Sequence, residues 1–286
     1  DLKGYAAAGD LVNANAYANQ ALLSGTYLGY QVYSVPTGEL LIGMDGKLNP
    51  KATLGYSDGT YYYIPDNWSD EIFENNVRQE YNLSVSGASD KMNYYMSAGY
   101  LDDQGIVPNS GFQRYSARLK ADYQVKPWLK LGANVSFTHY DSREQDTEGG
   151  TSNANIFYAS NIMGAIYPMY IRDAQGNIMT DNRGFQRYDY GKKGQDTNGS
   201  RNTIPNANPL ASYMLDKMKY SGDVVSGKWF ADVDIWGGIK AKVNIGVDAN
   251  NVRNTDMVNP FYGQYSETTG VGGLISVSTQ RTFSVN

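Results

Sequence analysis

Two carboxylates, Asp232 and Asp234, stand two residues apart in a run that alternates polar and apolar side chains. Residues i and i+2 of a β-strand point to the same face, so both carboxylates would share one surface. Paired carboxylates can hydrolyse a glycosidic bond when their separation suits the mechanism. Solvated charges on the polar face of a strand give the same pattern. We therefore predict no catalytic residues here and expect the chain not to be an enzyme.

Two further segments carry residue types that can hold ions. Carboxylates clustered in Asp102-Asp103-Gln104-Gly105 could bind calcium, which takes oxygen ligands. The segment lacks the regular spacing of a calcium loop, and Gly105 is equally typical of a turn. Gly237-Gly238 is not followed by a helix that could cradle a phosphate. We expect no metal and no cofactor.

Aromatic side chains gather in Tyr61-Tyr62-Tyr63 and at nearby Trp68. Such rings could stack on sugars, or they could pack within a strand and loop region. Packing within the strand and loop region is the role that we expect, and the sequence identifies no substrate-binding residue.

Composition excludes several classes of protein. The 286 residues include 24 Lys and Arg against 29 Asp and Glu, a net charge of −5 that argues against a nucleic-acid partner. There is no cysteine and a single histidine, His139, so a disulfide framework and a His-rich metal cluster are excluded. Mean hydropathy is −0.51, and no run approaches about 18 consecutive apolar residues, as a membrane-spanning helix requires.

The polar/apolar alternation is clearest at residues 114–125. Tyr115, Leu119 and Tyr123 would share one strand face. Arg118, Lys120 and Asp122 would share the other. Strands of globular proteins run to about 5–6 residues, whereas a strand tilted across a bilayer needs about 9–11. The length favours a barrel with lipid outside and water inside.

The same alternation predicts seven antiparallel strands. Phe230 and Arg281 are exceptions to it, because each falls on the face of the opposite character. The predicted strands lie at residues 81–86, 93–100, 114–125, 129–138, 228–235, 239–250 and 275–286.

Connections between these strands alternate between short and long. Outer-membrane barrels have short periplasmic turns on one rim and long extracellular loops on the other. Trp128 and Trp236 fall in short turns, where they fit either an interfacial aromatic girdle or turn packing in a soluble sandwich. The short connections are residues 87–92, 126–128 and 236–238, and the long ones are 102–113, 141–227 and 251–272.

The long connections contain helix signals. Asn208 followed by Pro209 and an apolar stripe predicts a helix, and the alanine-rich stretch 10–24 predicts another. Residues 1–77 show no comparable alternation and are expected to form a large extracellular loop region, with the barrel strands in 78–286. No signal peptide opens the chain, so either a leader has been removed or these residues begin inside a longer polypeptide.

An ordered series of short segments runs through most of the chain from about residue 28. The segments are Asp66-Asn67-Trp68-Ser69-Asp70-Glu71-Ile72-Phe73, Tyr81-Asn82-Leu83-Ser84-Val85-Ser86-Gly87, Asn93-Tyr94-Tyr95-Met96-Ser97-Ala98-Gly99-Tyr100-Leu101, Gln104-Gly105-Ile106, Arg114-Tyr115-Ser116-Ala117-Arg118, Trp128-Leu129-Lys130-Leu131-Gly132-Ala133-Asn134, Ile166-Tyr167-Pro168-Met169-Tyr170, Asp173-Ala174-Gln175-Gly176 and Tyr188-Asp189-Tyr190-Gly191. No single motif among them is diagnostic. As a series, they resemble the SusC/RagA-type TonB-dependent outer-membrane transporters of Bacteroidota.

The resemblance implies an all-β fold, an antiparallel up-and-down transmembrane barrel of 22 strands closed by a plug, of which seven strands are visible in this sequence. It implies multi-pass location in the cell outer membrane and active import of glycan oligosaccharides or peptides. A SusD-like surface lipoprotein, the TonB complex and outer-membrane lipid would be the partners. The plug and the TonB-contacting segment are not in these residues.

A soluble or secreted all-β carbohydrate-binding module is the alternative. Strand length and the rhythm of the connections favour the transporter, whereas the lack of a visible leader leaves the soluble module open.

Overall fold

The computed structural model describes residues 9–24, 28–144, 155–192, 197–205, 207–259 and 273–286, and these divide between two compact units. The loop unit takes its described residues from 1–73 and 146–212. The strand unit takes its described residues from 74–145, 213–260 and 273–286. The sequence placed a division near residue 77. The structure divides the chain after Phe73 and adds 146–212 to the first unit.

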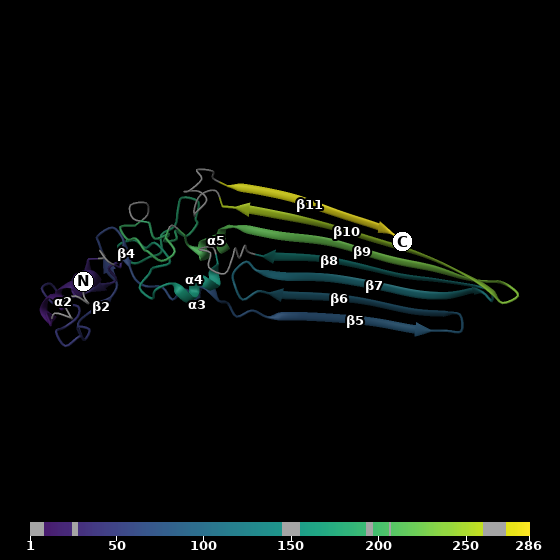
Figure 1. Cartoon of the computed structure of the whole chain (residues 1–286), viewed down its shortest axis with the longest axis horizontal. Coiled ribbons are helices and arrows are strands. Elements are labelled where there is room, and N and C mark those ends of the chain that lie inside the picture. Colours follow the sequence, from purple (N-terminus) through teal and green to yellow (C-terminus); the bar gives the residue numbers. More distant parts are fainter. Residues whose placement is uncertain (1–8, 25–27, 145–154, 193–196, 206, 260–272) are drawn as a thin grey trace. The chain divides into compact units, whose positions relative to one another are not determined.

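The strand unit contains one sheet of seven strands in the order β11-β10-β9-β8-β7-β6-β5 (Figure 1). Every strand pairs antiparallel with its neighbours in the chain, so the topology is up-and-down. The predicted number, order and direction of the strands are confirmed. Their bounds are β5 Arg78–Ala88, β6 Met92–Gln104, β7 Gly111–Lys126, β8 Leu129–Glu144, β9 Lys217–Trp236, β10 Ile239–Val258 and β11 Leu274–Val285.

The strands extend further toward the long connections than the alternation predicted. β9 begins at Lys217 and β10 continues to Val258, so the predicted loop bounds 141–227 and 251–272 were wrong. In these extensions Lys219, Ser221 and Arg253 lie on the side of the sheet that is apolar nearer the short turns, whereas Tyr220 and Val224 lie on the opposite side. The polar/apolar alternation therefore does not continue in the same phase, and the predicted strands end too early.

The short connections are tight hairpins. Gly237 and Gly238 join β9 to β10 with φ of 61° and 86°, the left-handed pair that a two-residue type I′ turn requires. Trp236 is 83% exposed and Trp128 is 53% exposed. Burial in a turn core is therefore not the role of either indole.

The loop unit is built from short elements. The stretches predicted as helices near Asp10 and after Asn208 coincide with α2 Leu11–Leu23 and α5 Pro209–Leu215. Asp10 Oδ1 accepts the Asn13 N–H at 3.1 Å and caps α2. Among the described residues, no helix is long and apolar enough to cross a membrane. The remaining elements are α3 Trp68–Ile72, α4 Ile156–Ile162, β1 Tyr33–Ser34, β2 Thr53–Leu54, β3 Tyr56–Ser57 and β4 Tyr62–Tyr63.

Buried tyrosines form the centre of one core cluster in the loop unit. Tyr30 meets Tyr63 and Tyr167 edge-on, with ring centroids 5.9 and 5.7 Å apart. Val32 completes the buried cluster. The Tyr30–Tyr167 contact joins residues that are more than 100 positions apart in the sequence, so the two predicted loops fold together.

The type I′ turn provides a test of the fold. Gly237→Val should destabilise the β9–β10 hairpin by about 1–2 kcal/mol, because a β-branched residue resists positive φ. Gly237→Asn is the matched control and should be nearly neutral, since asparagine suits this turn position. Urea unfolding midpoints of the two variants in the complete polypeptide measure the difference. Equal midpoints would contradict the assigned turn.

Candidate functional site

One face of the sheet in the strand unit is apolar over all seven strands, and we call it the apolar face. Directly paired residues of neighbouring strands lie on the same face, so the register defines its rows. Its large side chains are exposed: Leu119 by 47%, Trp229 by 42% and Phe283 by 69%. One row consists of Val85, Met96, Leu119, Val135, Gly227, Val247 and Val285. An adjacent row consists of Leu83, Ala98, Ala117, Phe137, Val225, Ala249 and Phe283.

The height of the apolar face matches a bilayer. On β10, every second residue from Ile239 to Ala249 is apolar. Ten residue steps of about 3.3 Å, tilted by about 40°, rise about 25 Å. That is the height of the apolar band of an outer-membrane barrel.

Aromatic rings border the apolar face toward the long connections. Tyr100 lies between Tyr81 and Tyr115, with ring centroids 6.4 and 5.0 Å away. His139 continues this row, and its Nδ1 lies 2.7 Å from Asp223 Oδ1. The row ends at Arg281, paired with Asn251. The exceptional position of Arg281 is thus explained, because it lies at the border of the apolar face rather than within it.

The reverse side of the sheet, which we call the polar face, carries charged and amide side chains. Asp232 and Asp234 do lie together on it, as predicted. Each faces a lysine of β10: Lys242 Nζ is 3.5 Å from Asp232, and Lys240 Nζ is 3.1 Å from Asp234. Such exposed ion pairs contribute little stability. Cross-strand pairing accounts for both carboxylates without an acid/base role.

Phe230, the other exception to the alternation, lies on the polar face over a glycine. A Cβ added to Gly132 would lie 2.0 Å from the Phe230 ring, so the ring occupies space that only glycine leaves free. Lys130 and Lys242 lie 5.9 and 5.0 Å from the ring centroid. Cation–π attraction to these two lysines therefore offsets the cost of placing an aromatic ring on the polar face.

The two carboxylates of the Asp102–Gly105 segment lie on different sides of the sheet. Asp102 and Asp103 are consecutive in β6 and point to opposite faces. Gln113 donates to Asp102 at 3.2 Å, and Arg78 lies 3.8 Å from Asp103. No group of three potential metal ligands occurs among the described residues.

Two rings of the aromatic segment 61–68 pack inside the loop unit. Tyr63 and Trp68 are buried. Tyr63 donates its hydroxyl to Asp58 at 2.8 Å, and Trp68 donates Nε1–H to the Tyr167 carbonyl at 3.0 Å. The packing role is thus observed for these two rings.

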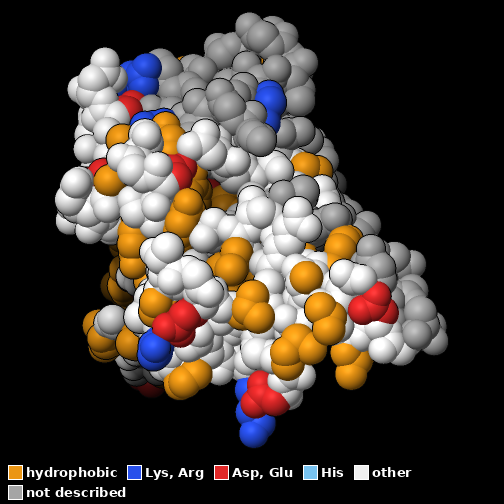
Figure 2. All heavy atoms as spheres, turned by 90° about the vertical axis from the view of Figure 1, so that its left-hand side faces the viewer, with side chains coloured by type: hydrophobic (Ala, Val, Ile, Leu, Met, Phe, Trp, Pro, Cys, Tyr) orange, Lys and Arg blue, Asp and Glu red, His pale blue; other side chains and the backbone are white. Residues whose placement is uncertain are grey.

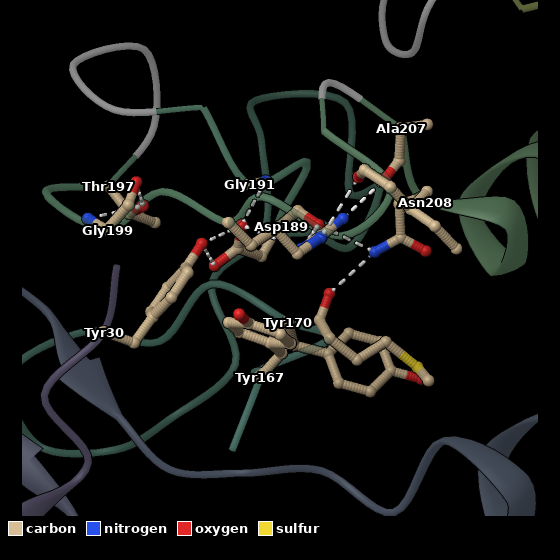
Figure 3. A network of polar contacts seen from close by, with 12 residues as sticks. Tyr30, Tyr167, Tyr170, Asp189, Gly191, Thr197, Gly199, Ala207 and Asn208 are labelled. Carbon is tan, nitrogen blue, oxygen red and sulfur yellow. Dashed lines mark hydrogen bonds and ion pairs between the residues drawn. The ribbon is translucent and has the colours of Figure 1, made fainter. Parts of the chain in front are cut away.

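A buried polar network, which the sequence did not reveal, holds the loop unit together (Figure 3). The Tyr30 hydroxyl lies 2.7 Å from both carboxylate oxygens of Asp189. Arg201 Nη1 lies 3.1 Å from the Asp189 carbonyl and 3.5 Å from Asp189 Oδ1. Asn208 Nδ2 donates to the carbonyls of Met169 and Asp189, each at 3.0 Å. Burial and the Asp189 carboxylate raise the pKa of the Tyr30 phenol, which therefore stays protonated and donates.

Two further carboxylates tie the first part of the loop unit to its second part. Asp66 forms a forked ion pair with Arg172, at 2.6 and 3.0 Å, and its Oδ2 accepts the Met169 N–H at 2.7 Å. Asp58 accepts from Asn198 Nδ2 at 2.7 Å. Partial burial opposes ionisation of Asp58, but the hydrogen bonds it accepts lower its pKa to about 2. These contacts join segments more than 100 residues apart and have no local sequence signal.

Apolar side chains also reach the surface of the loop unit. Leu40, Met44, Leu48 and Leu54 are all exposed. Figure 2 shows apolar side chains gathered among uncharged ones on the face that it presents, with few charged groups between them. Exposed apolar groups of this kind are typical of surfaces that contact a partner.

Removing the guanidinium from the buried network tests its importance. Arg201→Met should destabilise the loop unit by about 3–5 kcal/mol, because the Asp189 carboxylate would stay buried without that positive charge. Lys51→Met, which breaks the exposed pair with Glu39, is the control and should leave the protection nearly unchanged. Hydrogen exchange of the amides in 167–191 reports both. Unchanged protection in Arg201→Met would show that the network does not hold the unit.

The chain is similar to curated TonB-dependent receptors. It is 24% identical over 214 residues to TonB-dependent receptor P3 of Formosa agariphila. The aligned region covers 72% of this chain and 18% of that protein. It is 33% identical over 88 residues to TonB-dependent receptor SusC of Bacteroides thetaiotaomicron, covering 30% of this chain and 9% of that one. These relatives are receptors rather than enzymes, which agrees with the prediction of no catalytic activity. No protein-family model matches the chain.

Solved structures show the same fold. The RagAB peptide importer in its open-open state matches 80% of this chain with a TM-score of 0.58 at 21% identity, and 23% of the matched chain is covered. The RagAB peptide transporter matches 96% with a TM-score of 0.56 at 20% identity, and 26% of that chain is covered. The chain thus spans about a quarter of these structures and less than a fifth of the curated relatives above. The resemblance found in the sequence is confirmed: the chain is related to the SusC/RagA-type TonB-dependent receptors and corresponds to a segment of them.

Proposed function

We propose that these residues form part of the barrel wall and the extracellular loops of a TonB-dependent importer in the outer membrane. The observation that carries the proposal is the exposed apolar face, continuous over seven strands and backed by a charged face. Lipid would cover the apolar face, and the polar face would line the lumen of a barrel that has 22 strands when complete.

The exposed apolar face argues against the soluble carbohydrate-binding module. A soluble monomer rarely exposes an apolar patch of more than a few hundred Å². Large apolar residues are exposed on all seven strands, from Leu83 on β5 to Phe283 on β11. A second sheet packed on this face would be needed in water, and the described residues provide none.

The names of the relatives support a proposal about the substrate and the partners. We propose that glycan oligosaccharides or peptides are imported, because the relatives include SusC and a peptide importer. A SusD-like surface lipoprotein would rest on the loop unit, whose exposed apolar side chains offer a contact surface. The TonB complex would supply energy through parts of the polypeptide outside these residues.

Opposite substitutions on neighbouring residues of β7 test the membrane assignment. Leu119→Arg should impair folding into micelles, since a basic residue near the bilayer midplane costs about 2–4 kcal/mol. Lys120→Leu, on the polar face, is the matched control and should fold nearly normally. The folded fraction of the complete polypeptide after refolding measures both. Equal tolerance of the two changes would refute the assigned faces.

Labelling of the two rims tests the topology. In intact cells, a membrane-impermeant maleimide should label Ile106→Cys, in the connection between β6 and β7. It should not label Ser89→Cys, in the turn between β5 and β6. Both parent residues are exposed. Labelling of Ser89→Cys alone would invert the topology, and labelling of both would contradict the membrane location.

A further inference from the structure

Basic side chains gather just beyond the aromatic border of the apolar face, on its β8–β11 side. Arg281 lies in the same row as Tyr81, Tyr100 and Tyr115. Arg253 lies one row further toward the long connections, because its partners Ser221 and Thr279 are each two residues past that row. Arg143 and Lys219 pair directly with each other one row beyond Arg253. We call these four residues the basic cluster.

The members of the cluster are close enough to contact one ligand. Directly paired residues have Cβ atoms about 5 Å apart, which places the charges of Arg143 and Lys219 side by side. Arg253 is the diagonal neighbour of Lys219 on one side and of Arg281 on the other, at about 7–8 Å. All four side chains are exposed. Cations at these separations repel one another unless an anion lies among them.

Carboxylates on the same side of the sheet are already engaged. Asp141 lies 3.0 Å from Lys219 Nζ and also accepts from the Ser221 hydroxyl. Asp223 binds His139, whose other ring nitrogen lies 4.0 Å from Asp141. Gln113 donates to Asp102 on the far side of the row. Among the described residues, none of these acids forms an ion pair with an arginine of the cluster.

The arginines of the cluster therefore have N–H donors without an acceptor among the described residues. Arg143 and Arg253 make no hydrogen bond or ion pair with any described residue. Arg281 donates Nε–H to Asn251 at 3.2 Å and has no carboxylate partner among the described residues. Guanidinium groups present forked donors that fit the oxygens of a phosphate.

We propose that the basic cluster binds the phosphate group of a membrane lipid whose acyl chains lie on the apolar face. The inference rests on the proposed membrane location of that face. Its position favours a lipid over free phosphate, because the cluster begins in the row that borders the apolar band and extends about 13 Å along the strands. Lipid headgroups lie at this level, within reach of long arginine side chains.

Native mass spectrometry of the complete polypeptide tests the proposal. The protein is mixed in a zwitterionic detergent with equal amounts of dioleoylphosphatidic acid and dioleoylphosphatidylcholine, and the ratio of retained lipids is measured. The triple variant R143Q/R253Q/R281Q should lower the preference for phosphatidic acid roughly tenfold, as the loss of charge-assisted hydrogen bonds implies. R143K/R253K/R281K should keep most of the preference, because the charge remains.

The matched control is R118Q/K120Q/K228Q, which removes the same charge from the polar face. It should retain the preference for phosphatidic acid. An equal loss in the control, or no loss in the basic-cluster variant, would overturn the proposal. Excess inorganic phosphate should not displace the lipid, and displacement would assign the cluster to free phosphate instead. Flotation of the wild-type protein with vesicles distinguishes failure of the lipid site from failure of the membrane assignment. Wild type that floats but shows no lipid preference refutes only the lipid site. Wild type that does not float refutes the membrane assignment as well.

Discussion

Successive side chains of a strand point to opposite faces, and the antiparallel register fixes which residues of neighbouring strands share a face. In the strand unit this constraint places Leu119 beside Met96 and Val135, while Lys120 lies between Tyr95 and Asn134. A slip of one residue in β7 would bring Arg118, Lys120 and Asp122 to the apolar face. In a bilayer, that would exceed the margin of stability of a typical protein. The ladder of pairs shifts register at Gln124/Lys126 and at Ile239/Lys240, both next to short turns. Its regular pairing elsewhere allows the sheet to have two faces of opposite character.

The same hydrogen-bonding constraint acts at the two edges of the sheet. β5 and β11 each pair with one strand among the described residues, so each has a row of backbone groups without a strand partner. Such groups cost several kcal/mol each in lipid, which is why strands cross membranes only in closed barrels. On our proposal, further strands of the barrel complete both edges. In the loop unit, buried backbone groups outside a sheet also need hydrogen-bond partners. The Asn208 side chain donates to the carbonyls of Met169 and Asp189 there.

The sequence was sufficient for the parts of the fold that have a period. Alternation identified all seven strands, and Gly237-Gly238 and Lys126-Pro127-Trp128 marked two of the hairpins. Alternation failed at the ends of β9 and β10 next to the long connections. There, Lys219 and Arg253 lie on the side of the sheet that is apolar nearer the short turns. Phe230 and Arg281 broke the pattern for reasons that only cross-strand neighbours reveal: a glycine under the ring and a border row of aromatic side chains.

Long-range polar contacts could not be predicted in this way. Tyr30 and Asp189 are 159 residues apart, and neither lies in a motif that names the other as its partner. The carboxylates Asp58 and Asp66 are likewise ordinary loop residues until the fold brings Asn198 and Arg172 to them. The lack of alternation predicted two separate loops, 1–77 and 141–227. The buried contacts of these side chains instead join described residues of both into one folded unit.

The central claim is that alternate residues of the strands face lipid and water. A spin-label scan of β7 tests it most directly, because these 286 residues contain no cysteine of their own that would also take the label. Single cysteines at residues 117–122 would carry a nitroxide in the complete polypeptide, reconstituted in bilayers. Our account predicts high accessibility to oxygen at 117, 119 and 121 and to a water-soluble nickel complex at 118, 120 and 122. The same accessibility at all six positions, or alternation in the opposite phase, would contradict it.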